Sequence, residues 1–240
     1  MSTKLLIIDS EHSEGLSTNP NNFQVNITNE YLQNVRKVSL VGLRTINSQY
    51  NVNENNNVID YAYNGVNKQI IIPEGQYNIT TFTAAINGAQ ADFTVALNSL
   101  SLCLEWTGAG LPLTIYRNDS SYEVIGVTED LVDMVGGATL KSQLLPDLSG
   151  LSIIYVSSEA LAPANRILSN SEHSNIISSV GVDSAFGFPI YYQSQTIDDS
   201  DNHNYLTWNG INTIDIQLLD HNYKPCQLKS QVHLIFKIYH

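Results

Sequence analysis

The sequence predicts one all-β domain, a sandwich or barrel, with a single short helix. Short apolar runs recur along the chain, and polar turns separate them at intervals of about 8–12 residues, a spacing typical of such folds. Several runs alternate apolar with polar side chains, which is the period of a half-buried strand. Charged residues make up only 14% of the 240 residues, and much of the remaining polarity comes from Asn, Ser, Thr and Gln, which suit sheets and turns more than helices.

The first strands follow from this alternation. Residues 4–8 form an apolar run that predicts the first strand, and Phe23, Val25 and Ile27 then alternate with polar neighbours. Residues 35–46 also alternate, but both sets are largely apolar, so we expect a strand that is buried on both sides. Residues 51–57 form an Asn-rich loop, since Asn tolerates left-handed backbone angles.

One helix is expected after the strand at residues 68–72 and the turn Pro73-Glu74-Gly75. Asn78 is placed to cap it, and Gly88 to end it. Its buried face is formed by Ile79, Phe82 and Ile86.

The second half of the chain predicts a further series of strands that ends in a strand, a turn at His221-Asn222 and a last strand. Residues 121–125 fit either a strand or a helical turn, and residues 130–140 are ambiguous because Gly136-Gly137 interrupts them. Because the last strand ends almost at the final residue, we expect this terminus to be built into a sheet. The remaining expected strands are residues 93–97, 100–106, 113–116, 151–156, 176–180, 188–192, 214–218 and 228–239.

The charge balance excludes some partners. The formal net charge is -12, and the 11 basic residues form no run. Nucleic-acid binding needs clustered cations to neutralise phosphates, so we expect no nucleic-acid partner. An acidic surface also argues against anionic membranes, and no stretch has the roughly 18 apolar residues of a membrane span, so no membrane insertion is expected.

A search for chemistry finds no catalytic signature. The sequence has no phosphate-binding loop, no dinucleotide fingerprint and no nucleophile elbow, and its six histidines lack metal-ligand spacing. We therefore expect no enzyme activity, no catalytic residue and no cofactor. Cys103 and Cys226 lie in apolar surroundings and are expected to be buried free thiols, although the sequence leaves a disulfide between them open.

Two acidic segments are candidate metal sites. Residues 198–203, Asp-Asp-Ser-Asp-Asn-His, could bind Ca²⁺ through closely spaced carboxylates. The segment lacks the glycine and the terminal glutamate of a calcium loop, so a solvated acidic loop is the favoured interpretation. Asp9, Glu11, His12 and Glu14 are similarly interpreted as a charged turn.

Four aromatic residues are candidates for recognition. Trp106 and Trp208 fit a core or interface position better than a sugar-stacking platform. Tyr191 and Tyr192 are consecutive on an expected strand, so one ring should face inward and the other outward. The outward ring would be an interface anchor.

Three segments together form a recognisable order. They are Ile8-Asp9-Ser10 with Asn21-Asn22-Phe23-Gln24-Val25, then Ile70-Ile71-Ile72-Pro73-Glu74-Gly75-Gln76-Tyr77-Asn78-Ile79 with Phe82 and Ile86-Asn87, and Ile214-Asp215-Ile216-Gln217-Leu218-Leu219-Asp220 followed by the strand to Tyr239. This order resembles the penton, or minor capsid, proteins of virophages, polinton-like viruses and related large double-stranded DNA viruses, and the middle segment is its most specific part. In the family the turn before the last strand often has a glycine; here residues 220–225 have none, and we expect Asn222 to supply the left-handed residue.

The resemblance implies a single jelly roll of two antiparallel sheets over residues 1–240, and we expect a loop insertion around residues 118–175. It implies a homopentamer at the five-fold vertices of the virion, in contact with the major capsid protein and assembled in the infected host cell. We expect Tyr191, Tyr192 and Trp208 at assembly interfaces. The alternatives are a receptor- or glycan-binding spike module, a β-fold hydrolase and a major coat subunit.

Overall fold

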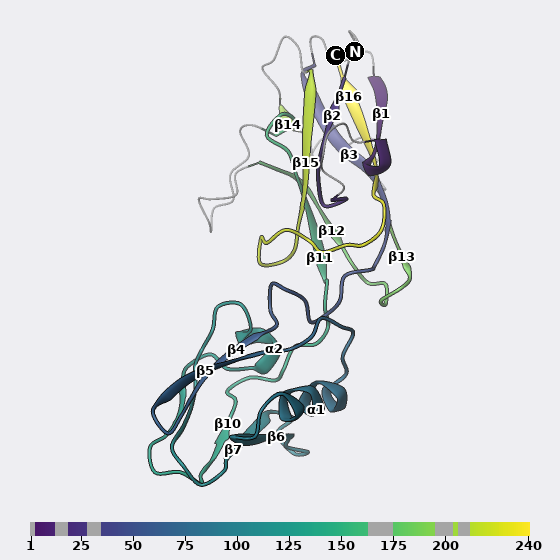
Figure 1. Ribbon diagram of the computed structural model, residues 1–240. Coiled ribbons are helices and arrows are strands. Elements are labelled where there is room, and N and C mark those ends of the chain that lie inside the picture. The colour runs from purple at the N-terminus through teal and green to yellow at the C-terminus, as the bar shows by residue number, and fades with distance from the viewer. Residues whose placement is uncertain (1–2, 13–18, 28–34, 163–174, 195–203, 206–211) are drawn as a thin grey trace. The chain divides into compact units, whose positions relative to one another are not determined.

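The computed structural model describes residues 3–12, 19–27, 35–162, 175–194, 204–205 and 212–240. The chain forms two compact units. One consists of Met1–Gln49 together with Leu151–His240, and the other, which we call the inserted unit, is Tyr50–Gly150 (Figure 1). This division differs from the expected single domain with an insertion near residues 118–175, because the inserted segment starts about seventy residues earlier and has a core of its own.

The two-segment unit contains two antiparallel sheets. Apart from the short β14, its described strands number eight, and we count them in chain order. One sheet holds the first, eighth, third and sixth strands, and the other holds the fifth, fourth, seventh and second. This order is that of a jelly roll, so we call this part the jelly-roll unit.

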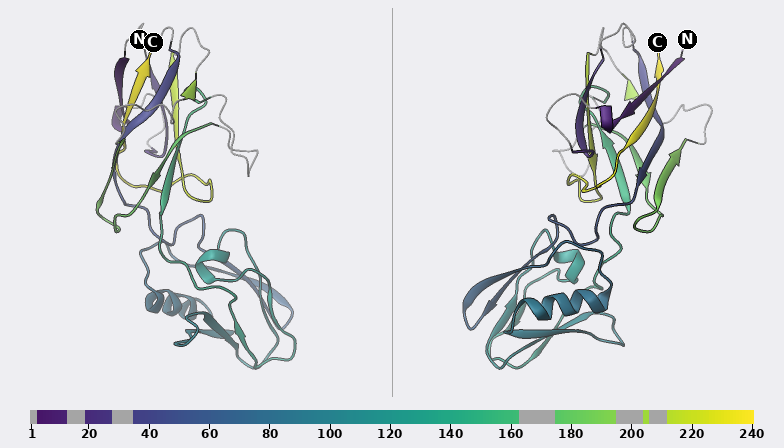
Figure 2. Two further views of the ribbon diagram at one scale, coloured as in Figure 1. Left: turned by 180° about the vertical axis from the view of Figure 1, so that it is seen from behind. Right: turned by 45° about the vertical axis from the view of Figure 1, so that its right-hand side comes forward.

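The sheets are named by their strand order. The first, sheet β1-β16-β3-β13, consists of β1 (Thr3–Asp9), β16 (His233–Tyr239), β3 (Lys37–Ile46) and β13 (Pro189–Gln193), with β14 (Asn204–Tyr205) also paired to β3. The second, sheet β12-β11-β15-β2, consists of β12 (Ile176–Gly181), β11 (Ile153–Ser157), β15 (Thr213–Leu219) and β2 (Asn22–Asn26). Both views of Figure 2 show β1, β16 and β3 side by side, and a 3-10 turn, η1 (Ser10–His12), follows β1.

The core of the jelly-roll unit comes from the inward side chains of both sheets. On β16 these are Leu234, Phe236 and Ile238, all buried, while the residues between them are partly exposed. Strand β1 pairs along its whole length with β16, from Thr3 opposite Tyr239 to Asp9 opposite His233. The expectation that the chain's last strand is built into a sheet is therefore confirmed.

The inserted unit has two further antiparallel sheets and its own core, in which Trp106 is fully buried. Asn51 joins the two ends of this unit, since its side-chain amide donates to the carbonyls of Tyr77 at 2.7 Å and Leu148 at 2.8 Å. The sheets are β5 (Val66–Ile71), β4 (Val58–Tyr63), β8 (Leu113–Ile115) and β9 (Leu131–Asp133), and β10 (Thr139–Lys141), β7 (Leu104–Gly108) and β6 (Phe93–Leu97).

The expected helix is present as α1 (Ile79–Ala89). Asn78 caps it in a reciprocal capping box with Thr81, and Phe82 and Ile86 are buried. The helix runs one residue past Gly88, so Gly88 does not end it. A second, one-turn helix, α2 (Tyr122–Ile125), lies where the sequence allowed either a strand or a helical turn.

The all-β class with antiparallel sheets is confirmed, and two α-helices lie in the described part of the chain where one was expected. Another expectation fails in the turn after β15. Tyr223, with φ 58°, takes the left-handed conformation there, and Asn222 does not. The backbone N–H groups of Asn222 and Lys224 both donate to the Asp220 carboxylate, which fixes the turn one residue later than expected.

Candidate interaction surfaces

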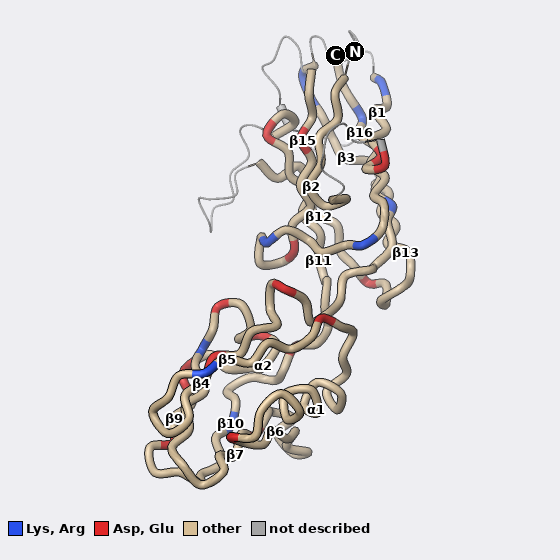
Figure 3. The backbone as a smooth tube through the Cα atoms, viewed as in Figure 1, with Lys and Arg blue, Asp and Glu red and all other residues tan. Residues whose placement is uncertain are grey.

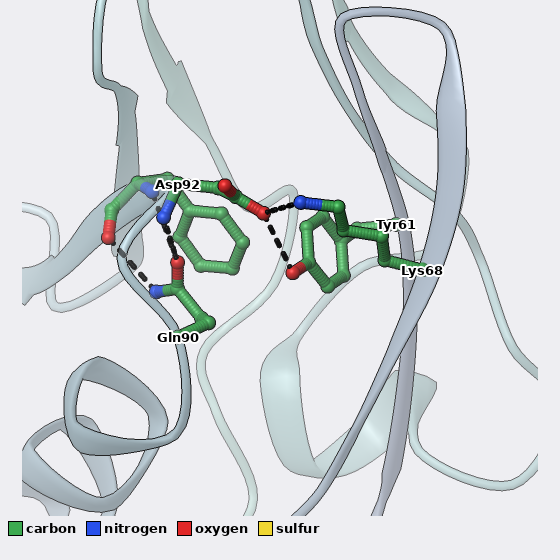
Figure 4. Close-up of polar contacts among 5 residues, drawn as sticks. Tyr61, Lys68, Gln90 and Asp92 are labelled. Atoms are coloured by element: carbon green, nitrogen blue, oxygen red, sulfur yellow. Dashed lines mark hydrogen bonds and ion pairs between the residues drawn. The ribbon is translucent and has the colours of Figure 1, made fainter.

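Buried and half-buried polar clusters are the first places to look for chemistry, and the best connected one holds the inserted unit together. The Asp92 carboxylate accepts hydrogen bonds from the Tyr61 hydroxyl at 2.9 Å and from Lys68 Nζ at 2.6 Å (Figure 4). The Gln90 side chain fixes the same turn through the backbone N–H groups of Asp92 and Phe93. Tyr61 and Lys68 come from β4 and β5, whereas Asp92 precedes β6, so the cluster links the two sheets of the unit.

The electrostatics of this cluster suit structure and not catalysis. Burial, helped by the bond to Asp92, raises the pKa of Tyr61 to about 12, so its hydroxyl stays protonated and is a poor nucleophile. The bond from Lys68 lowers the pKa of Asp92, which stays ionised. Each group is held in the state in which it serves as a hydrogen-bond partner.

Two other carboxylates also organise loops. Asp133 accepts the backbone N–H groups of Val135, Gly136 and Ala138, and these bonds lower its pKa. Asp215 accepts the N–H groups of Glu159 and Ala160 at 2.9 and 3.0 Å. Both carboxylates therefore have their acceptor capacity taken up by the fold.

The metal and thiol candidates come from different parts of the chain. Residues 198–203 lie outside the described residues, so the calcium hypothesis stays a prediction. Within the described ranges no group of His, Cys, Asp or Glu is arranged to hold a metal ion. Cys103 and Cys226 are both buried and free, as expected, and burial raises the pKa of the Cys226 thiol. In the described part of the chain, no helix has the length and apolar character to cross a membrane.

The aromatic candidates differ in where they lie in the fold. Trp106 lies in the core of the inserted unit, where its indole N–H donates to Ser142 Oγ at 3.0 Å, so it is not a sugar platform. Trp208 lies outside the described residues. On β13 the two tyrosines face opposite sides, as predicted: Tyr191 is 69% exposed, and Tyr192 packs partly against the core. Their role at an interface stays a prediction.

The outer face of sheet β1-β16-β3-β13 was missed by the sequence analysis. Its strands pair so that Ile7 lies beside Ile235, and Ile235 beside Gly42. Leu5 is 66% and Ile7 68% exposed. One signal was available: the unbroken run Leu5-Leu6-Ile7-Ile8 places apolar side chains on both sides of the strand, so one pair must face outward.

Cations accompany this apolar row. The sheet carries Lys4, Lys37, Arg44 and Lys237, and blue segments of the tube in Figure 3 lie on β1, β3 and β16. The one acidic residue on the described strands of this sheet is Asp9, whose carboxylate Oδ2 lies 2.9 Å from His233 Nδ1. Among the described residues, Arg44 and Lys237 form no ion pair with any carboxylate.

The outer face of sheet β12-β11-β15-β2 is different. Its four strands contain no Lys or Arg, and Asp215 is their one charged residue. The outward positions of β2 and β15 hold short polar groups such as Gln24, Asn26 and Gln217. Along β2 and β15 this face has the composition of an ordinary solvated sheet surface.

The comparisons with known proteins agree with this architecture. No family model matches the sequence, and no curated protein matches it. Among solved structures, the mavirus penton protein superposes with a TM-score of 0.51 at 10% sequence identity, covering 99% of this chain and 99% of that one. A chain from the Sputnik virophage structure has a TM-score of 0.43 at 11% identity and covers 98% of this chain and 97% of its own. The single jelly roll that the sequence resemblance implied is confirmed, and this chain shares the fold of the mavirus penton protein along nearly its whole length.

Proposed function

We propose that this chain is a penton: a structural capsid protein, not an enzyme, whose five copies form a ring at each five-fold vertex of an icosahedral double-stranded DNA virus. The single observation that carries this proposal is the full-length match, jelly roll and insertion together, to the mavirus penton protein. The likeness shows the fold, and the sequence resemblance to penton proteins extends the interpretation from fold to role.

The polar clusters support a structural role. Each carboxylate cluster described above has a partner within the fold, and the Tyr61 hydroxyl is held in its protonated state. The exposed apolar side chains Leu5 and Ile7 have no such internal role, and they lie on a sheet face. A capsid subunit works through faces of this kind, because assembly requires extended complementary surfaces.

The proposed partners are further copies of this chain and the major capsid protein of the same virus, and the proposed location is the vertex of the virion. The alternative of a glycan-binding spike module is weaker, since one of the two tryptophans on which it depended, Trp106, is fully buried.

Native mass spectrometry of the purified full chain tests the proposal. A penton should give a species of five times the 26.6 kDa chain mass that dissociates reversibly on dilution. A chain that stays monomeric at every concentration, or that forms only two-fold or three-fold species, contradicts it.

A further inference from the structure

The outer face of sheet β1-β16-β3-β13 has the features of a protein contact surface. We call it the cationic face and define it by Leu5, Ile7, Arg44, Ile235 and Lys237. The two residues on β1 are about two-thirds exposed, at 66% and 68%. They lie on a strand that is paired at every position from Thr3 to Asp9, so they are held on a sheet and not on a loop.

The row at the centre of this face is flat for a local reason. An ideal Cβ placed on Gly42 would lie only 3.3 Å from Ile235 Cδ1, so the Ile235 side chain lies down against β3. Glycine at this position leaves the space for it. An apolar, flat centre with charges beside it is the composition of an interface core and its rim.

Charge restricts the partner. Lys237 lies opposite Leu5, and Arg44 lies between His233 and Tyr191, so the apolar row has a cation on both sides. A duplex nucleic acid would use the cations but would leave the exposed leucine and isoleucine without apolar partners. A protein with an acidic surface can pair with the cations and can also cover the exposed leucine and isoleucine with apolar side chains of its own.

A second copy of this chain is such a protein. Its net charge is -12, and the inserted unit carries eleven Asp and Glu against three Lys and Arg. Contact through the same face on both copies would bring Arg44 and Lys237 near their own counterparts, and such like-charge contacts are costly. The cationic face therefore requires a different, acidic surface of its neighbour, and such head-to-tail contacts are the kind that close rings.

We infer that the cationic face is the surface through which each subunit packs against an acidic surface of the next copy in the ring. This inference rests on the proposed function and specifies its geometry: the contact is heterologous, with an apolar centre at Ile7 and Ile235. Tyr191, which lies on the same outer side beside Arg44, extends the contact toward the β13 edge.

Two variants test the inference by the assembly they form in native mass spectrometry. Leu5→Gln/Ile7→Gln removes the two exposed apolar side chains that β1 contributes to the face, and Arg44→Gln/Lys237→Gln lowers the net charge by two. Each should raise the concentration at which half of the chains are assembled by at least about tenfold. Far-UV circular dichroism of the dissociated chains should match the wild type.

Matched controls are available elsewhere on the molecule. Leu100→Gln/Val135→Gln replaces two apolar residues that are 94% and 86% exposed in the inserted unit. Gln217→Glu/Ser179→Glu makes the same change of net charge on the strands of the other sheet. Both controls should stay within about twofold of the wild-type midpoint.

The outcomes separate the two proposals. If the wild type forms pentamers and the variants of the cationic face assemble as well as it does, this inference is overturned and the proposed function stands. If the wild type does not assemble, both fail. If Arg44→Gln/Lys237→Gln leaves the ring intact but abolishes binding of a duplex DNA probe, the face belongs to nucleic acid and the inference is wrong.

Discussion

The two sheets of the jelly-roll unit share one core but present different outer faces. Sheet β12-β11-β15-β2 has polar side chains along β2 and β15 and no cation on its strands, whereas sheet β1-β16-β3-β13 shows exposed Leu5 and Ile7 beside Arg44 and Lys237. Folding alone does not require this difference, because both sheets contribute buried side chains to the same core. The inference of a partner for the cationic face accounts for this difference, because contiguous exposed apolar surface marks interaction sites.

The largest expected effect comes from comparing inward and outward positions of one strand. Substitution of the buried residue should cost far more free energy of unfolding than substitution of its exposed neighbour. Phe236→Ala on β16 removes a fully buried ring from the jelly-roll core and should lower the free energy of unfolding by about 3–5 kcal/mol. Its outward neighbour, Lys237→Ala, should change it by no more than about 0.5 kcal/mol. Urea denaturation at a single chain concentration measures both, and similar losses for the two would contradict the assignment of faces.

The next effect sharpens the same distinction on β13. Tyr192 packs partly against the core, so Tyr192→Ala should cost about 1–2 kcal/mol of folding stability in the same assay. Tyr191→Ala should leave stability almost unchanged and weaken assembly instead. A stable Tyr192→Ala chain that fails to assemble would reverse the roles that burial gives these two residues.

Much of this pattern could be predicted from the sequence, and its limits are physical. Alternation identified β2, β15 and β16, and Asn78 with Phe82 and Ile86 identified α1, because those signals are local. The division into two units could not be predicted, since β3, the strand before the insertion, pairs with β13 and β16, which lie far away in sequence. The cationic face was missed for the same reason: Ile7, Ile235 and Gly42 become neighbours only once the strand register is known.

The inserted unit offers a smaller effect, because there polar side chains join sheets instead of covering them. The pKa of Asp92 is lowered in the folded state, so its contribution is present at neutral pH and is lost as the pH falls below about 3.9, the ordinary value for Asp, and through the lowered pKa. Asp92→Asn should cost about 1 kcal/mol at neutral pH, since the partner Lys68 is 40% exposed and solvent screens the pair. The free energy of unfolding of this variant should also fall less steeply than that of the wild type as the pH is lowered.

At alkaline pH, the contribution of Tyr61 to folding stability is lost as the pH rises. The pKa of Tyr61 is raised to about 12, so its contribution is fully present below about pH 10 and is lost as the pH rises through 12. Tyr61→Phe should remove that alkaline loss. Denaturant titrations over the pH range measure both variants, and an unchanged pH profile in both would show that the cluster does not stabilise the unit.

The smallest expected effect is on the unfolding free energy of the dissociated chain when residues on the outer faces are replaced. Ile7→Gln and Gln217→Glu replace outward residues on opposite sheets, and each should shift the unfolding free energy of the monomer by no more than about 0.5 kcal/mol. Thermal denaturation below the assembly concentration measures these shifts. A large loss for Ile7→Gln would mean that this side chain serves the fold and not a partner.

Electron microscopy of the purified wild-type chain would show whether it forms the ring. Class averages should be closed rings with five-fold symmetry in which each subunit presents its cationic face to a different surface of its neighbour. Single chains, or particles with two-fold symmetry joined through that same face, would contradict it.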